Sequence, residues 1–234
     1  MYPRTDVELN AELPSTAEFW TPEPDDIDEE GFGYFRDVWA IVGVPEDEAR
    51  QMLHKDRAAS FFVSELASTE AEFDAIARVI ETGVSDYAED LSAAKRAALG
   101  PYIAADEDDP VPLDGLDVGV AGLVYALSAA GAYPAASCRG HHGDHSWSHV
   151  PVVLFAIDRC RANVLAPLVR EAGCGFEIDT ARAELLVVYS ASIEGTIALA
   201  EAVIGRLPEF RACDESHPMP PDPFVQPSLF DEES

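Results

Sequence analysis

The chain has 234 residues, of which 47% are hydrophobic, so it can form one ordinary domain or two small ones with a real core. Its 44 acidic and 15 basic residues give a net charge of −29, which excludes the extended basic surface that proteins need to bind DNA or RNA tightly on their own. The first residues lack the pattern of a signal peptide, and the longest apolar run, Val152–Ile157, is too short to cross a bilayer. We therefore expect a cytoplasmic protein without a membrane partner.

The N-terminal half reads as a flexible lead-in followed by helices. Residues 1–30 are acidic and rich in proline, which is typical of a disordered segment. Residues 31–103 predict a helical domain. Apolar spacing and turn residues favour four helices. The first would contain Phe35, Val38, Trp39 and Val42, and the second would begin near Pro45. The third would run from Ser68-Thr69 to Gly83, and the fourth would cover residues 86–99.

The C-terminal half predicts an α+β domain. Residues 104–114 contain acids and two prolines and read as a linker, and residues 115–207 give the order α-β-β-α-β-β-α. This order is typical of a sandwich in which helices cover one face of a largely antiparallel sheet. The predicted elements are a helix at 117–130, strands at 135–138 and 152–157, a helix capped by Asp158 and closed by Gly173, strands at 176–178 and 185–189, and a helix capped by Ser192 that runs to about 207.

A histidine-rich segment follows the first strand of this domain. The segment Ala136–His149 contains four of the six histidines of the chain. Cys138, His141, His145 and His149 have the spacing C-x2-H-x3-H-x3-H, and sulfur and imidazole are ligands that zinc prefers. No second ligand pair lies elsewhere in the sequence. The pattern therefore favours an open or weak zinc site over a closed structural one.

Two other interpretations of this segment remain open. Cys138 and His141 could act without metal as a nucleophile and base, with Arg139 as the anion contact that lowers the pKa of the thiol. Alternatively, the segment is a solvated loop that carries one buried cysteine. The four cysteines, at positions 138, 160, 174 and 213, are irregularly spaced, and we expect all of them to be free thiols.

The segment Leu123–Gly140 resembles the helix-then-strand entry of the wybutosine-pathway tRNA methyltransferases, which carry a Ser-Cys-x-Gly-Arg motif. Ser137, Cys138 and Gly140 match that motif, and His141 stands where the family has arginine. The resemblance implies S-adenosylmethionine as a cofactor and tRNA as the substrate.

The last residues, 208–234, read as a flexible acidic tail rich in proline. Its segment Gln226–Phe230, QPSLF, resembles the bacterial sliding-clamp binding motif. The resemblance implies that Leu229 and Phe230 enter an apolar groove on the clamp and that Gln226 supplies hydrogen bonds. A protein that cannot grip DNA itself could work there when it is tethered to the clamp.

The leading hypothesis is a cytoplasmic bacterial protein with a Cys/His site, possible zinc binding, and recruitment to DNA replication or repair through its tail. One alternative is a non-enzymatic acidic interaction protein that mimics DNA or inhibits another factor. A further alternative is a tRNA-modifying methyltransferase.

Overall fold

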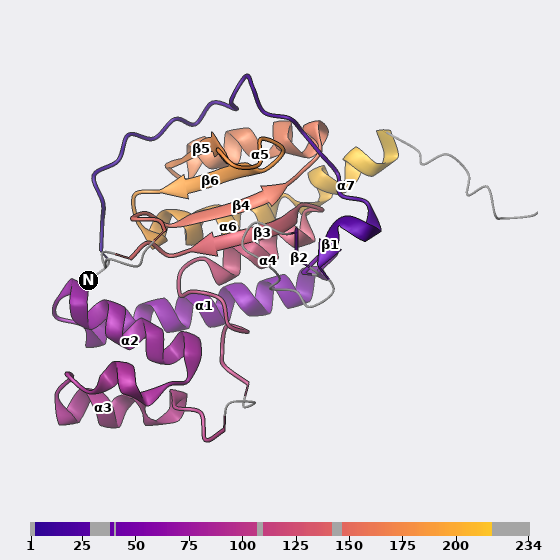
Figure 1. Cartoon of the computed structure of the whole chain (residues 1–234). Coiled ribbons are helices and arrows are strands. Elements are labelled where there is room, and N and C mark those ends of the chain that lie inside the picture. The colour runs from indigo at the N-terminus through magenta and orange to yellow at the C-terminus, as the bar shows by residue number, and fades with distance from the viewer. Residues whose placement is uncertain (1–2, 29–37, 40, 107–109, 142–146, 217–234) are drawn as a thin grey trace, which may run out of the picture.

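The chain folds as an α+β protein, shown in Figure 1 as a computed structural model. The structure describes residues 3–28, 38–39, 41–106, 110–141 and 147–216. Within these residues, a four-stranded antiparallel sheet is combined with seven α-helices, which confirms the predicted α+β class. None of the described helices is long and apolar enough to cross a membrane.

The order of elements in the C-terminal half is α-β-β-α-β-β-α from α4 to α6, which confirms the predicted pattern. A last helix, α7, follows, and two very short strands form a separate parallel pair. The bounds are α1 Glu46–Leu66, α2 Glu70–Thr82, α3 Ala93–Leu99, α4 Ala121–Ala129, β3 Tyr133–Cys138, β4 Val152–Ala156, α5 Arg159–Glu171, β5 Cys174–Ile178, β6 Leu186–Ser190, α6 Ile193–Gly205 and α7 Leu207–Ser216, with β1 Ile27–Asp28 and β2 Val38–Trp39 as the short pair.

The main sheet has the strand order β3-β4-β6-β5, and every neighbouring pair is antiparallel. The two central strands, β4 and β6, are buried along their whole length. Strands that are buried on both faces read as continuous apolar runs rather than as alternating patterns. The sequences VVLFA and LVVYS of these strands have this character, which is why they could be recognised before the fold was known.

The helices form two layers behind the sheet. Helices α4, α5 and α6 pack on the sheet, and α1 lies across α4 and α6 (Figure 1). One continuous hydrophobic core therefore runs from α2 through α1 and α4 to the strands. The helix ends follow predicted signals: the Thr69 hydroxyl accepts a hydrogen bond from the Glu72 amide, and Gly83 ends α2 in the left-handed conformation. Asp158 likewise caps α5 through the Arg161 amide.

The N-terminal segment is more ordered than its composition suggests. Residues 3–23 run past the sheet without helix or strand, and a 3-10 turn, Pro24–Asp26, follows them before β1 (Figure 1). The backbone oxygen of Asn10 accepts a hydrogen bond from the Phe176 amide of edge strand β5, and the Tyr189 hydroxyl donates to the Glu8 carbonyl. Trp20 packs against a small apolar cluster on the strands. Apolar residues spaced along this acidic segment therefore attach it to the sheet, in place of the expected flexible lead-in.

Three local predictions differ from the structure. Val38 and Trp39 were assigned to a helical face but form β2. The helix expected over 86–99 is a short 3-10 turn, Ser85–Ala88, followed by α3, which begins at Ala93 and has Ser92 as its N-cap. Residues 208–216, assigned to the flexible tail, belong to α7. In each case a short-range signal, whether apolar spacing, stop residues or acidic composition, was compatible with more than one conformation, and tertiary packing selected one of them.

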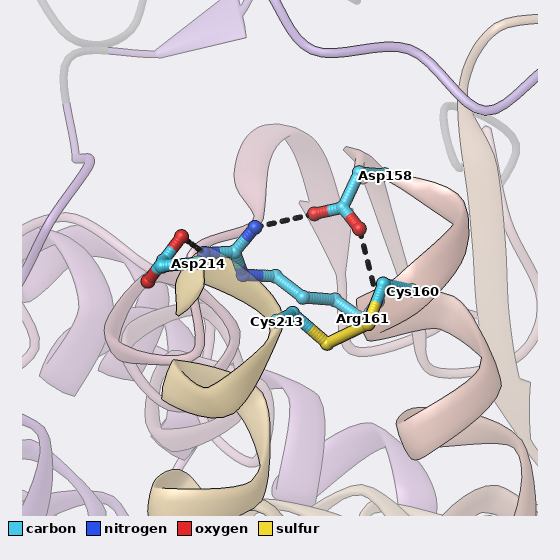
Figure 2. The surroundings of a disulfide bond; sticks show 5 residues. All are labelled: Asp158, Cys160, Arg161, Cys213 and Asp214. Atoms are coloured by element: carbon cyan, nitrogen blue, oxygen red, sulfur yellow. Dashed lines mark hydrogen bonds and ion pairs between the residues drawn. A yellow bond between two sulfur atoms is a disulfide. The ribbon is translucent and has the colours of Figure 1, made fainter. Parts of the chain in front are cut away.

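The prediction that all four cysteines are thiols was wrong for two of them. Cys160, in the first turn of α5, forms a disulfide with Cys213 of α7 (Figure 2). Arg161 forms ion pairs with Asp158 and with Asp214 beside this bond. The two cysteines are 53 residues apart and meet because α7 packs against α5, which their spacing in the sequence does not reveal. Cys138 and Cys174 are free and buried.

Candidate functional site

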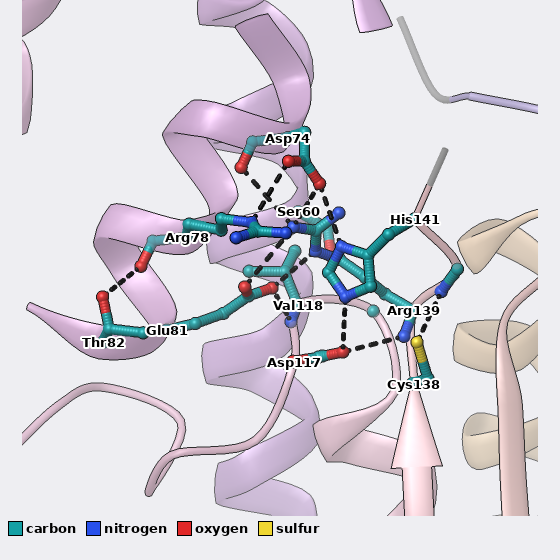
Figure 3. A network of polar contacts seen from close by, with 12 residues as sticks. Ser60, Asp74, Arg78, Glu81, Thr82, Asp117, Val118, Cys138, Arg139 and His141 are labelled. Carbon is teal, nitrogen blue, oxygen red and sulfur yellow. Dashed lines mark hydrogen bonds and ion pairs between the residues drawn. The ribbon is translucent and has the colours of Figure 1, made fainter. Parts of the chain in front are cut away.

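The candidate site lies where β3 ends and faces α2 and the turn before α4 (Figure 3). Cys138 is the last residue of β3, and Arg139, Gly140 and His141 follow it directly. Helix α2 contributes Asp74 and Glu81, and the turn before α4 contributes Asp117. The site thus combines side chains from three segments that are far apart in the sequence.

Asp117, Cys138 and His141 form a group that could hold a metal ion. One ligand atom from each residue lies within 4.8 Å of the others, and His141 Nε2 is 3.4 Å from Asp117 Oδ2. Cys138 is almost fully buried, with 1% of its surface exposed. The sequence predicted Cys138 and His141 as ligands, whereas Asp117 was not among the candidates.

His141 is held from both sides of its ring. Its Nδ1 lies 2.9 Å from Asp74 Oδ1, and its backbone amide donates a hydrogen bond to the Ser148 carbonyl. Hydrogen bonding to Asp117, then to Asp74 and to Cys138, raises the pKa of His141 to about 11. In the metal-free protein the imidazole is therefore a cation between two carboxylates.

Arg139 is the other buried cation of the site. Its Nε is 2.7 Å from Glu81 Oε1, its Nη2 is 2.8 Å from Asp74 Oδ1, and its backbone amide donates to Asp117 Oδ2 at 3.0 Å. Burial acts to lower the pKa of the guanidinium, but Glu81 and the two aspartates outweigh it and raise the pKa. The predicted anion contact of Arg139 is therefore made first of all with carboxylates of the protein itself.

The surrounding carboxylates respond differently to this environment. Burial acts to raise the pKa of Asp74, yet the hydrogen bond with His141 and the charge of Arg139 hold it well below its usual range. The same two partners lower the pKa of Asp117 against the effect of burial. Burial dominates for Glu81 and raises its pKa, although Arg139 opposes the shift. The two carboxylates that face His141 are therefore the ones that stay ionised most strongly.

Gly140 allows the chain to turn back at the end of β3. It has φ +82°, and a Cβ at this position would lie 2.8 Å from the carbonyl carbon of Val150 and 2.9 Å from its Cα. The Gly140 amide points toward Cys138 Sγ at 3.4 Å. A glycine is needed here because a side chain would clash with backbone, which cannot move aside easily.

The remaining sequence-predicted residues lie apart from this group or outside the described residues. His149 is exposed, and its Nδ1 is 3.2 Å from the backbone oxygen of His141, so it contacts the backbone of this residue and is not part of the group of ligand atoms. His145 lies outside the described residues, as do Gln226, Leu229 and Phe230 of the tail.

Three acids of the site were missed from the sequence, and two of them carried a signal. Asp74, Arg78 and Glu81 are spaced i, i+4 and i+7 on α2 and therefore share one stripe of the helix. Glu81 is 5% exposed, so the stripe continues into the core instead of facing solvent. A polar stripe beside an apolar face could have indicated a buried partner, which proves to be Arg139. Asp117 carried no comparable signal.

Comparisons with known proteins leave this site to be interpreted from its geometry. No protein-family model, curated protein sequence or solved structure matches the chain.

Proposed function

We propose that the protein binds one zinc ion through the Asp117 carboxylate, the Cys138 thiolate and His141 Nε2. The observation that carries the proposal is the convergence of these three ligand atoms within 4.8 Å. With zinc–ligand bonds of about 2.0–2.3 Å, ligand atoms of a tetrahedron lie roughly 3.3–3.7 Å apart. The 3.4 Å between His141 Nε2 and Asp117 Oδ2 already matches this spacing.

The residues around the three ligands support this assignment. A metal-bound histidine usually gives its second ring nitrogen to a carboxylate, which fixes its tautomer and orientation. Asp74 occupies that position at 2.9 Å from His141 Nδ1, which leaves Nε2 facing Asp117 and the thiol. The Arg139 amide similarly orients Asp117, and the Gly140 amide lies toward Cys138 Sγ. Metal would take the place of the Nε2 proton between ligands that are already in position.

Burial of Cys138 favours a ligand role over a nucleophilic one. Reactive cysteines are at least partly exposed to their substrates, whereas the Cys138 thiol is 1% exposed. Three protein ligands leave one coordination position of zinc open. Zinc bound in this way acts as a Lewis acid and lowers the pKa of a coordinated water, which is the arrangement of catalytic rather than structural sites.

The second half of the proposal concerns the tail. We propose that Gln226, Leu229 and Phe230 recruit the protein to a sliding clamp. A net charge of −29 opposes direct binding to DNA, and tethering to a ring that encircles DNA would raise the local concentration of the protein there. The proposal places the protein in the cytoplasm, at replicating or damaged DNA.

Metal analysis tests the first half. Protein purified without a histidine tag and incubated with zinc should retain about one ion per chain after gel filtration, as expected for a site with three protein ligands. Cys138→Ala and His141→Ala should retain none, and Asp74→Asn should weaken zinc binding by about 10–100-fold. His149→Ala is the matched control, because His149 lies in the same loop but outside the ligand group. Wild-type protein that retains no zinc, or equal loss in the His149 variant, would refute the site.

A binding measurement with a purified bacterial clamp tests the second half. The full chain should bind the immobilised clamp, and the double substitution Leu229→Ala/Phe230→Ala should abolish binding because it removes both apolar anchors. Met219→Ala, an apolar truncation outside the motif, is the control. Equal binding by all three proteins would exclude this use of the tail while leaving the zinc result unaffected.

A further inference from the structure

A cavity of about 410 Å³ opens directly beside the site. It lies between the first turn of α2, the segment after β3, the start of α6 and the N-terminal segment. Pockets of this size are typical for small-molecule ligands. Six of its lining residues define its character: Thr5, Phe73, Asp74, Arg139, Pro151 and Ile193.

Arg139 supplies a hydrogen-bond donor at this cavity. Its side chain is 3% exposed, and its Nε and Nη2 are engaged by Glu81 and Asp74 (Figure 3). Its Nη1 makes no hydrogen bond with any residue that the structure describes. Nη1 is not one of the fully buried unpaired atoms of the described residues, so it keeps some exposed surface. Because Arg139 lines the cavity, a ligand oxygen there could accept a hydrogen bond from this nitrogen.

The charge of the surroundings restricts which acceptor fits. The carboxylates of Glu81, Asp74 and Asp117 face two cations, Arg139 and His141, so this network keeps an excess of negative charge. Glu70 also lines the cavity and adds to that excess. A further carboxylate or phosphate would be repelled by these acids. An ammonium group would meet the guanidinium itself, while the nearby carboxylates are already bonded. An uncharged carbonyl oxygen can accept from Nη1 without either penalty.

The rest of the wall is suited to an apolar group. Phe73 and Ile193 are each 3% exposed, and Pro151 and Ala191 extend the apolar surface. We infer that the cavity binds an uncharged small molecule that places a carbonyl or amide oxygen against Arg139 and an apolar body against Phe73 and Ile193. The inference depends on the cavity and not on bound zinc.

Three probes with the same aromatic body and different head groups test the inference: benzamide, benzoate and benzylamine. Their dissociation constants can be measured by NMR titration of the full-length protein, once with added zinc and once with a chelator. Benzamide should bind at least about 10-fold more tightly than either charged probe, a difference of about 1.4 kcal/mol. Benzamide should also shift the side-chain Nε–Hε resonance of Arg139.

A substitution that narrows the cavity keeps the test independent of the buried ion network. Ala71 is an exposed residue of α2 that lines the cavity, so Ala71→Phe should weaken benzamide binding at least about 10-fold without disturbing the core. Ala58→Phe is the matched control on an exposed face of α1, away from the cavity. Binding that is tightest for benzoate or benzylamine, unchanged in Ala71→Phe, or absent for all three probes would overturn the inference. None of these outcomes depends on whether zinc is retained.

Discussion

At the scale of single residues, Gly140 determines whether the chain can turn back after β3. Its left-handed backbone and its contact with the Val150 backbone leave no space for a Cβ. The same turn brings His141 back over Cys138, so the geometry of the candidate site depends on a position that has no functional group of its own.

We expect Gly140→Ala to destabilise the protein by more than about 2 kcal/mol, because it combines an unfavourable φ with a clash against backbone. Gly43→Ala is the matched control: Gly43 also has a positive φ, +63°, but nothing lies within 4 Å of a Cβ there, so a loss of about 1 kcal/mol is expected. Urea unfolding followed by circular dichroism measures both. Equal losses would show that the Val150 contact is relieved without cost.

Asp56 is a fully buried acid on α1 that caps a different helix. Its two carboxylate oxygens accept hydrogen bonds from the Gly119 and Gly122 amides at the N-terminus of α4. Burial nevertheless outweighs these bonds and raises the pKa of Asp56 from 3.8 to about 6. The folded protein therefore binds the proton of Asp56 more tightly than the unfolded chain does.

The sign of the resulting pH dependence follows from linkage. The contribution of Asp56 to stability is complete below pH 3.8 and is lost as the pH rises to about 6, with a maximum change of about 3 kcal/mol. Asparagine does not titrate, so the stability of the Asp56→Asn variant relative to the wild type should increase when the pH is raised from about 4.5 to about 7.5. Urea unfolding at both pH values measures this difference, with the exposed Asp47→Asn on the same helix as control. A difference that is independent of pH would contradict the raised pKa.

At the scale of elements, α7 is attached by a covalent bond as well as by packing. The Cys160–Cys213 disulfide closes a loop of 53 residues and lies next to the ion pairs of Arg161 (Figure 2). Because α7 is the last described element, this bond ties the end of the described chain to α5.

Reduction of this disulfide should lower the free energy of unfolding by about 2–4 kcal/mol, because the unfolded chain regains the freedom of the closed loop. Amide hydrogen exchange within α7 should accelerate more than exchange within β4 and β6. The double variant Cys160→Ser/Cys213→Ser controls for other effects of the reductant and should not respond to it. Wild-type protein that unfolds at the same urea concentration with and without reductant would contradict the prediction.

The elements differ in how far the sequence could predict them. Helix α2 and the central strands β4 and β6 were predicted from strong local signals: a capping residue, a stop glycine or a β-branched apolar run. Helix α1 and the edge strands β3 and β5 were also predicted, from weaker local signals. The N-terminal segment and α7 were assigned to flexible chain, since their acidic composition conceals the apolar residues that contact the core. The tertiary surface that receives these residues cannot be inferred from local pattern.

At the scale of the whole molecule, the excess of acids is the dominant electrostatic feature. Many described arginines form pairs with nearby acids, such as Arg50 with Glu46 and Arg170 with Glu12. With 44 acidic and 15 basic residues, however, most acids have no basic partner available, and their mutual repulsion opposes the compact state.

Salt should therefore stabilise the protein. Raising sodium chloride from roughly 0.05 M to about 1 M shortens the Debye length from more than 10 Å to about 3 Å and screens repulsion between surface acids. We expect a gain of at least about 1 kcal/mol, which at this size corresponds to a Tm increase of roughly 2–4 °C. Differential scanning calorimetry across the series checks the effect. A falling Tm would mean that the ion pairs contribute more than the excess negative charge costs.

The sequence by itself determined the α+β class, the order α-β-β-α-β-β-α and two of the three proposed ligands, Cys138 and His141. These follow from local periodicity, capping residues and residue chemistry, which act over a few neighbouring positions. Only the tertiary structure decided that Asp117 lies beside these two ligands, that Asp74 and Glu81 form ion pairs around the group, and that His149 lies outside it. It also decided that Cys160 meets Cys213. Each of these outcomes depends on the packing of elements that are distant in the sequence, and no short-range pattern specifies how two such surfaces meet.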